Sequence, residues 1–287
     1  GSITAASNTT TIDDDDTASL AIAATDTATE QGGAQNTAVT LTLGGSGTGP
    51  AELAVQLTAD VVDATGGSAI SVTDYTAIGT QTLTYVVGST DSTVQNVVVT
   101  PTNDLLVEGN ETVNLTLQNL NSTVDGQASL GTSSSVVTID DDDTASLAIA
   151  ATDTAIEEGG AQNTAVTLTL GGSGSGPAEL AVPVTADIVD AGGGSAVSGT
   201  DYTPIGTQTL TFVASSTNGA VQNAVVTPTN DLLVEGNEIV NLTLQNVSSL
   251  DGQGSITAAS NTTTIDDDDT ASLAIAATDT ATEEGGA

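Results

Sequence analysis

The chain has 287 residues, among them 37 aspartates and glutamates and no lysine, arginine or histidine, so its formal net charge is −37. Nucleic acids and anionic membrane surfaces are therefore poor partners, because their binding relies on lysine and arginine, and cations are the natural complement. The chain has no cysteine, which excludes disulfides, and it has no 18-residue apolar run, so we expect no membrane span.

One unit of sequence is repeated along the chain. Residues 17–143 and 144–269 are two copies, of 127 and 126 residues. Residues 1–34 reappear as 254–287 with one change, Gln31 to Glu284. We therefore expect the last strand of a preceding repeat at 1–16, two complete domains at 17–143 and 144–269, and the first strand of a following repeat at 270–287. Either a longer parent chain continues on both sides, or neighbouring molecules complete the terminal strands.

Short strands are predicted throughout the first repeat. Apolar and polar residues alternate, or short apolar runs lie between turns, at 18–24, 37–43, 51–57, 81–87, 94–100, 111–118 and 133–139. About seven strands at this spacing predict an all-β fold of sandwich domains. Tyr85 and Phe212 occupy matching positions, which predicts a core aromatic with little use for its hydroxyl. Tyr75 and Tyr202 are expected to pack under a loop.

Acidic residues recur at five matching places in each repeat. In the first repeat they are Glu30, Asp74, Asp104, Glu108 with Glu111, and Asp140 to Asp143; in the second they are Glu157 with Glu158, Asp201, Asp231, Glu235 with Glu238, and Asp266 to Asp269. Such oxygen donors suit a hard cation, Ca²⁺ or Mg²⁺, whereas zinc and copper sites need histidine or cysteine. Solvated turn residues are the alternative, and the spacing of an EF-hand is absent.

The order of these motifs resembles the Calx-β domain, a module of the regulatory loop of sodium–calcium exchangers and of many large bacterial surface proteins. The motifs of the first repeat are Glu-x-Gly-Gly, Asp-Tyr-Thr, Leu-Val-Glu-Gly-Asn-Glu and Val-Thr-Ile-Asp-Asp-Asp. The resemblance covers both repeats, and it implies tandem immunoglobulin-like antiparallel β-sandwiches of about seven strands, each with a Ca²⁺ cluster at one end.

The resemblance also implies a set of ligands. They are Glu30, Asp74, Asp104, Glu108, Glu111, Asp141, Asp142 and Asp143 in the first repeat, and Glu157, Asp201, Asp231, Glu235, Glu238, Asp267, Asp268 and Asp269 in the second. Calcium-sensing members of the family carry adjacent aspartates before the glutamate-rich loop. Here the first of the two is Asn103 or Asn230, which lowers the charge of the site.

The sequence predicts a protein that is not an enzyme. A Ser–His–Asp or Cys–His arrangement is impossible without histidine, and the few aromatics offer no sugar platform for a pair of glycosidase carboxylates. We expect a structural segment of a calcium-stiffened extracellular or cell-surface rod or filament, such as an adhesin extender. Its expected partners are neighbouring repeats, identical chains, or a cell-surface or matrix molecule. The alternatives are a calcium-responsive module that binds a protein or sugar, and a filament subunit completed by strand addition.

Overall fold

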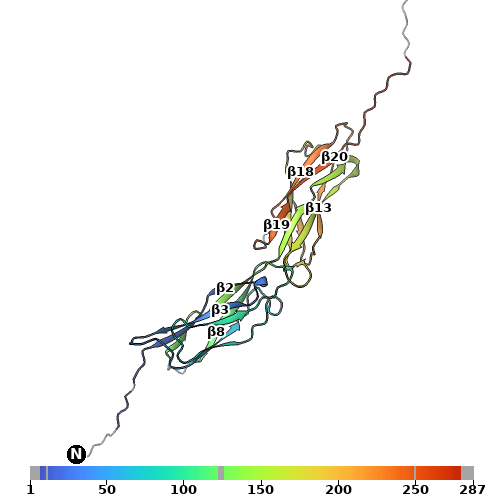
Figure 1. Cartoon of the computed structure of the whole chain (residues 1–287). Helices are drawn as coiled ribbons and strands as arrows, with labels where there is room; N and C mark the ends of the chain where they lie inside the picture. Colours follow the sequence, from blue (N-terminus) through green and yellow to red (C-terminus); the bar gives the residue numbers. More distant parts are fainter. Residues whose placement is uncertain (1–6, 11, 122–125, 249, 279–287) are drawn as a thin grey trace, which may run out of the picture. The chain divides into compact units, whose positions relative to one another are not determined.

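The computed structural model describes residues 7–10, 12–121, 126–248 and 250–278 (Figure 1). These residues form strands and two single-turn 3-10 helices, η1 (Glu30–Gly32) and η2 (Glu157–Gly159). None of the helices in this part of the chain has the length and apolar character needed to span a bilayer. The predicted all-β class is confirmed.

The chain divides into two compact units. Unit 1 comprises the described residues up to Thr144, together with Gly171–Ala181 and Leu250–Gln253. Unit 2 comprises residues 145–170 and 182–248 and the described residues from Gly254 onward.

Unit 1 is a sandwich of two sheets. The first has the order β6-β3-β1-β9, with β1 (Thr17–Ile22), β3 (Gln35–Gly44), β6 (Val94–Val99) and β9 (Ala128–Leu130). The second has the order β2-β10-β8-β4-β5, with β2 (Thr25–Thr29), β4 (Leu57–Asp63), β5 (Gln81–Tyr85), β8 (Glu111–Asn121) and β10 (Ser134–Asp140). Neighbouring strands are antiparallel except in the pairs β1–β9 and β2–β10, which are parallel. A separate parallel pair joins β7 (Leu106–Val107) to β14 (Glu179–Leu180).

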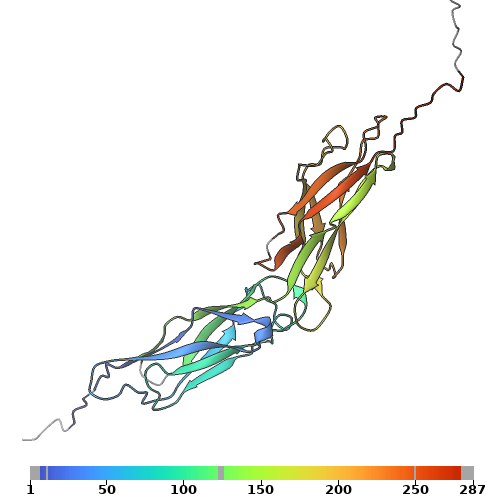
Figure 2. The ribbon, with the colours of Figure 1, turned by 45° about the horizontal axis from the view of Figure 1, so that its top comes forward.

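Unit 2 repeats this plan (Figure 2). Its first sheet has the order β17-β13-β11-β19, with β11 (Thr144–Ile149), β13 (Gln162–Gly171), β17 (Val221–Val226) and β19 (Gly254–Ala258). Its second has the order β12-β20-β18-β15-β16, with β12 (Thr152–Ile156), β15 (Val184–Asp190), β16 (Gln208–Phe212), β18 (Glu238–Gln245) and β20 (Ser260–Asp266).

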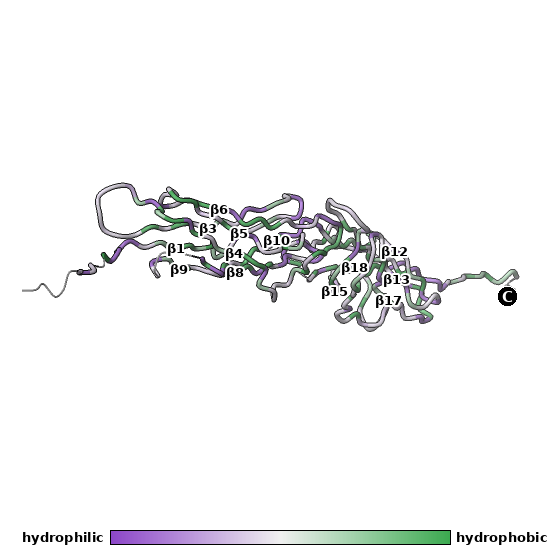
Figure 3. The backbone as a smooth tube through the Cα atoms, turned by 90° about the horizontal axis from the view of Figure 1, so that it is seen from below, coloured by the Kyte–Doolittle hydropathy of each residue, from purple (hydrophilic) through white to green (hydrophobic). Residues whose placement is uncertain are grey.

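The core lies between the sheets because alternate side chains of each strand point inward. Leu20 and Ile22 of β1 and Leu115 and Leu117 of β8 are buried, and hydrophobic and hydrophilic residues alternate along the strands (Figure 3). Burying each such side chain stabilises the fold by about 1.5–3 kcal/mol. These periodic runs are the reason why most of the strands could be located from the sequence.

The aromatic residues are buried, with one correction to their predicted role. Tyr85 and Phe212 are core residues, but the Tyr85 hydroxyl does have a partner, since it donates to the Val39 carbonyl at 2.6 Å. Tyr75 and Tyr202 are buried as well. Their hydroxyls donate to carboxylates at the ends of β4 and β15, which ties the loop after each strand to the sheet.

The strand predicted at 51–57 is wrong. These residues form a loop with one isolated bridge at Glu52, and β4 begins only at Leu57. Leu53 is buried although it lies in no strand, so the alternating pattern came from loop packing. The two aspartates of β4, Asp60 and Asp63, locally disfavour a strand, which is why the sequence did not reveal it.

Residues 7–10, 12–16 and 270–278 lie in the segments predicted as terminal strands, and they form no strand. The rest of both segments lies outside the described residues.

Candidate metal centre

Strand register brings the acidic residues of unit 1 together. In the second sheet Asp140, the last residue of β10, pairs with Thr29, and Ile139 pairs with Glu111. Glu111 belongs to one of these pairs, and Glu30 and Asp141 each follow a residue of the other pair. Residues far apart in sequence therefore meet where β2 and β10 end and β8 begins. These acidic residues lie close together because strand β10 stays paired with β2 and β8 as far as this end of the sheet.

Two groups of three carboxylates result in unit 1. The first is Glu30 with Asp141 and Asp143, all buried, and the second is Asp74 with Glu108 and Glu111. Within each group, one carboxylate oxygen from each residue lies within 4.8 Å of those of the other two. This is a spacing at which a single cation can contact all three residues.

Asp141 also organises the loop that carries the glutamates. Its Oδ2 accepts hydrogen bonds from the N–H groups of Glu108 and Gly109, both at 2.9 Å, and its Oδ1 accepts one from Asp143 at 2.8 Å. Gly109 has φ of +83°, which a side chain would disfavour, so the glycine allows the turn between Glu108 and Glu111.

Burial and mutual repulsion shift the pKa values of these carboxyl groups. Burial, followed by the charges of Asp141 and Asp104, raises the pKa of Glu30 to about 8. Burial and a hydrogen bond to Asp74 raise the pKa of Glu111 to about 8. Burial is also the main reason why the pKa of Asp143 rises to about 7. Such shifts occur where carboxylates have neither solvent nor a positive neighbour.

Several carboxylate oxygens of unit 1 have no hydrogen-bond donor among the described residues. They include Glu30 Oε2 and both carboxylate oxygens of Asp143, all buried. A buried anionic oxygen without a partner is costly, and a bound cation removes that cost. The Asn103 side-chain oxygen is buried without a partner as well, so a neutral oxygen donor faces inward beside Asp104. The donor set therefore consists of hard oxygen atoms, which fits Ca²⁺.

Unit 2 repeats both groups with more exposure. Glu157 joins Asp267 and Asp269, and Asp201 joins Glu235 and Glu238. Asp267 accepts from the N–H groups of Glu235 and Gly236 at 2.8 Å, as Asp141 does in unit 1. Burial, then Asp201, raises the pKa of Glu238 to about 7.

Four of the residues predicted as ligands belong to none of these groups. Asp104 and Asp231 accept hydrogen bonds from the N–H groups of Leu106 and Leu233, two residues further along the chain. Asp142 accepts from the Ser173 hydroxyl at 2.9 Å. The charge of Asp104 raises the pKa of Glu30, and that of Asp268 raises the pKa of Glu157, so both are close enough to influence the groups.

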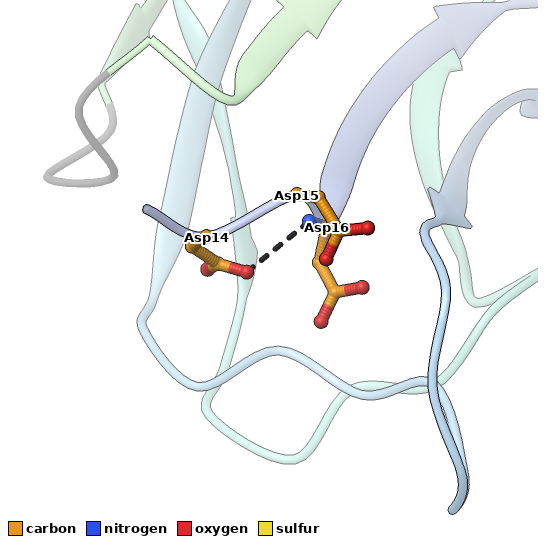
Figure 4. A group of neighbouring side chains, drawn as sticks. All are labelled: Asp14, Asp15 and Asp16. Atoms are coloured by element: carbon orange, nitrogen blue, oxygen red, sulfur yellow. Dashed lines mark hydrogen bonds between the residues drawn. The ribbon is translucent and has the colours of Figure 1, made fainter. Parts of the chain in front are cut away.

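A further acidic group was not among the predicted ligands. Asp14, Asp15 and Asp16 approach one another in exposed positions, where the Asp16 N–H donates to Asp14 Oδ1 at 3.1 Å (Figure 4). Asp14 and Asp16, together with residues 43–55, border a pocket of about 330 Å³. The signal for this group was available, since the same four-aspartate run stands at 140–143.

Sequence comparison identifies the family. The Calx-beta domain family matches residues 13–143 and again residues 140–269, which together cover most of the chain. The chain belongs to the Calx-beta family. Calx-beta domains are calcium-binding domains, and the acidic groups of both units are consistent with that property. The expected cofactor, Ca²⁺, is confirmed at the level of the family.

Comparison with solved structures finds matches to domains of Calx. The crystal structure of CBD12 from CALX1.2 is 13% identical, with 86% of this chain and 98% of that chain covered and a TM-score of 0.35. The apo-form Calx CBD1 domain is 19% identical, with 44% and 99% covered and a TM-score of 0.34. The calcium-binding domain CBD12 of CALX1.1 is 13% identical, with 85% and 98% covered and a TM-score of 0.33. No curated protein matches the chain.

Proposed function

We propose that the chain is a non-enzymatic structural segment whose two Calx-beta units fold around bound Ca²⁺. The observation that carries this proposal is the group of Glu30, Asp141 and Asp143, three buried carboxylates within 4.8 Å in a chain that has no cationic side chain. No side chain of the protein can neutralise them, so their charge is removed by a bound cation or by protonation. In unit 1 one ion would be held by this group and a second by Asp74, Glu108 and Glu111, with the matching groups doing the same in unit 2.

Calcium binding should stabilise the fold. At a free Ca²⁺ concentration 100-fold above Kd, each ion that binds only the folded state adds about 2.7 kcal/mol to the free energy of unfolding. We expect the melting temperature to rise by several degrees or more between EGTA and Ca²⁺, as measured by calorimetry. Identical melting curves would contradict the calcium proposal, and Glu179→Gln, which removes a carboxylate outside every acidic group, should leave the shift unchanged.

We further propose that the segment is an extracellular or cell-surface spacer, part of a rod or filament. Two properties of the sequence support this. The two repeats match at most positions, and Asp141 to Asp143 are the only residues between β10 and β11. A spacer needs length rather than diversity, and Ca²⁺ on these aspartates would stiffen a linker that is otherwise self-repelling.

Small-angle scattering tests the spacer proposal. Replacing Asp141 to Asp143 with asparagine should leave both units folded but broaden the distribution of interatomic distances at saturating Ca²⁺. The same substitutions at Asp267 to Asp269 are the matched control, because no described strand follows them. Unchanged scattering from the first variant would refute a stiffening role.

A further inference from the structure

The acidic loop has different surroundings in the two units although its sequence is the same. Asn-Asp-Leu-Leu-Val-Glu-Gly-Asn-Glu occupies residues 103–111 and 230–238. In unit 1 this loop contains β7, which pairs with β14, and Val107 is fully buried. In unit 2 the matching Val234 is 56% exposed, and residues 232–234 form no strand. An apolar run that is covered in one copy and bare in the other is a candidate docking edge.

The segment that covers the loop in unit 1 also occurs a second time in the chain. It is Gly171–Ala181, which is part of unit 1, and residues 44–54 repeat it with a single change, Thr48 for Ser175. A segment with the sequence needed to cover residues 232–234 is therefore present in every copy of the chain.

The hydrogen-bonding groups of residues 44–54 are available for the same pairing. In unit 1 the Ala181 N–H donates to the Val107 carbonyl at 3.0 Å. The matching N–H, that of Ala54, donates to no acceptor among the described residues, and the matching Val234 carbonyl receives no hydrogen bond from them. A free donor and a free acceptor of the same register are what strand addition requires.

A second pair of identical segments differs in the same way. Residues 266–278 repeat residues 13–25 without a change. Leu20, within the first of these segments, is fully buried in the core of unit 1 as part of β1. Residues 270–278 form no strand, and the matching Leu273 is 103% exposed.

We propose that copies of this chain associate head to tail by exchanging this segment. Residues 266–278 of one copy replace residues 13–25 in unit 1 of the second copy. Residues 44–54 of the second copy then cover residues 232–234 of the first. Because the exchanged sequences are identical, each incoming side chain packs against the same core residues as the one it replaces, and the net stabilisation comes from covering the docking edge.

Two glycines show why docking requires the exchange. A Cβ on Gly172 would collide with Asp143, and a Cβ on Gly45 would collide with Asp16, so an aspartate run packs against the glycine in both places. If a second copy docked while its own Asp16 stayed against Gly45, the aspartate run of the first copy, Asp266 to Asp269, would have to approach the same glycine. The exchange leaves a single run there, the one that the first copy supplies.

This inference rests on the proposed function, because two chains of charge −37 approach each other only when the carboxylates at the contact are neutralised by Ca²⁺ or screened by concentrated salt. It differs from that function in its outcome, since calcium can bind each unit without any association of copies. Calcium binding and association are therefore measured separately, by titration calorimetry and by analytical ultracentrifugation.

The test uses the full chain refolded from denaturant at high concentration with Ca²⁺, since opening of the central strand β1 is otherwise slow. The wild type should show an average mass of about twice the monomer or more at concentrations up to about 1 mM. Leu273→Asp should be monomeric, because it places a charge where Leu20 lies in the core. Gly47→Ala should also be monomeric, because a Cβ on the matching Gly174 collides with the Asp104 carbonyl, whereas a Cβ on Gly47 meets no atom within 4 Å.

The two variants should complement each other. Gly47→Ala keeps an intact donor segment and Leu273→Asp keeps an intact unit 1, so an equimolar mixture should form 1:1 dimers and nothing larger. Val213→Asp replaces an exposed valine outside these segments, and Gly79→Ala adds a Cβ that meets no atom within 4 Å, so both should associate like the wild type.

Separate outcomes overturn the two proposals. A wild type that binds Ca²⁺ but stays monomeric refutes the exchange and leaves the calcium function standing. Association of Leu273→Asp or Gly47→Ala alone has the same meaning. A chain that binds no Ca²⁺ refutes the calcium function. The exchange is then tested in about 1 M NaCl, where screening replaces the ion, and a monomer there refutes it too.

Discussion

Glu30 and Glu111 show what a chain without cations does to a single carboxyl group. Both have an ordinary pKa of 4.5, and burial raises it to about 8 in the folded state. Between these values the folded chain keeps protons that the unfolded chain has lost. The sign of the pH dependence follows from this difference in bound protons.

Without calcium, the free energy of unfolding should therefore fall as the pH rises from about 4.5 to about 8. Denaturant titrations in EGTA across this range test the expectation. The double variant Glu30→Gln and Glu111→Gln should reduce the slope, because it removes the two groups whose pKa is raised to about 8. Stability that stays constant or increases with pH in the wild type would show that these groups are ionised in the folded state.

The acidic loop between β6 and β8 is the element that the site depends on, and Asp141 holds it in place. The carboxylate accepts N–H groups of the loop on one oxygen and that of Asp143 on the other, all at 2.8–2.9 Å. Hydrogen bonds to a charged group contribute about 1.5–3 kcal/mol, more than neutral ones. The loop should therefore keep its shape even before an ion binds.

Asp141→Ala should lower the free energy of unfolding of unit 1 in EGTA by roughly 1–3 kcal/mol relative to Asp142→Ala. Both variants remove one negative charge from the same aspartate run, so they have the same net charge. Among the described residues Asp142 accepts only the Ser173 hydroxyl, and we expect the loss of the backbone hydrogen bonds to Asp141 to exceed the greater relief of repulsion within its carboxylate group. Equal stabilities, measured by urea denaturation, would mean that Asp141 does not anchor the loop.

For the whole molecule, the dominant property is a charge of −37 with no internal counter-charge. Self-repulsion opposes the compact state, and the Debye length falls from about 30 Å to about 8 Å between 0.01 M and 0.15 M salt. Stability should therefore depend strongly on ionic strength as well as on calcium.

In EGTA, raising NaCl over this range should increase the melting temperature by several degrees. With saturating Ca²⁺ the increase should be smaller, because bound ions already neutralise the sites where the carboxylates crowd. A salt effect of the same size in both conditions would place the repulsion away from the acidic groups.

Local patterns in the sequence were sufficient for the fold class, the repeat and the family. Alternation located strands such as β3 and β8 because it reflects which face of a strand is buried. The absence of histidine, cysteine and every cation restricted the site to oxygen ligands and a hard cation. Motif order was enough to select Glu30, Asp74 and the glutamates of the loop, although their role as ligands stays a prediction.

Only the tertiary structure decided how these residues are grouped. Sheet register placed Glu30 with Asp141 and Asp143, and left Asp104 and Asp142 outside both groups. The pairing of β7 with β14 also covers Val107, whereas the identical residue of the second repeat, Val234, is exposed. Identical sequences cannot encode that difference, because burial depends on which distant segment packs against a residue, and no local pattern records it.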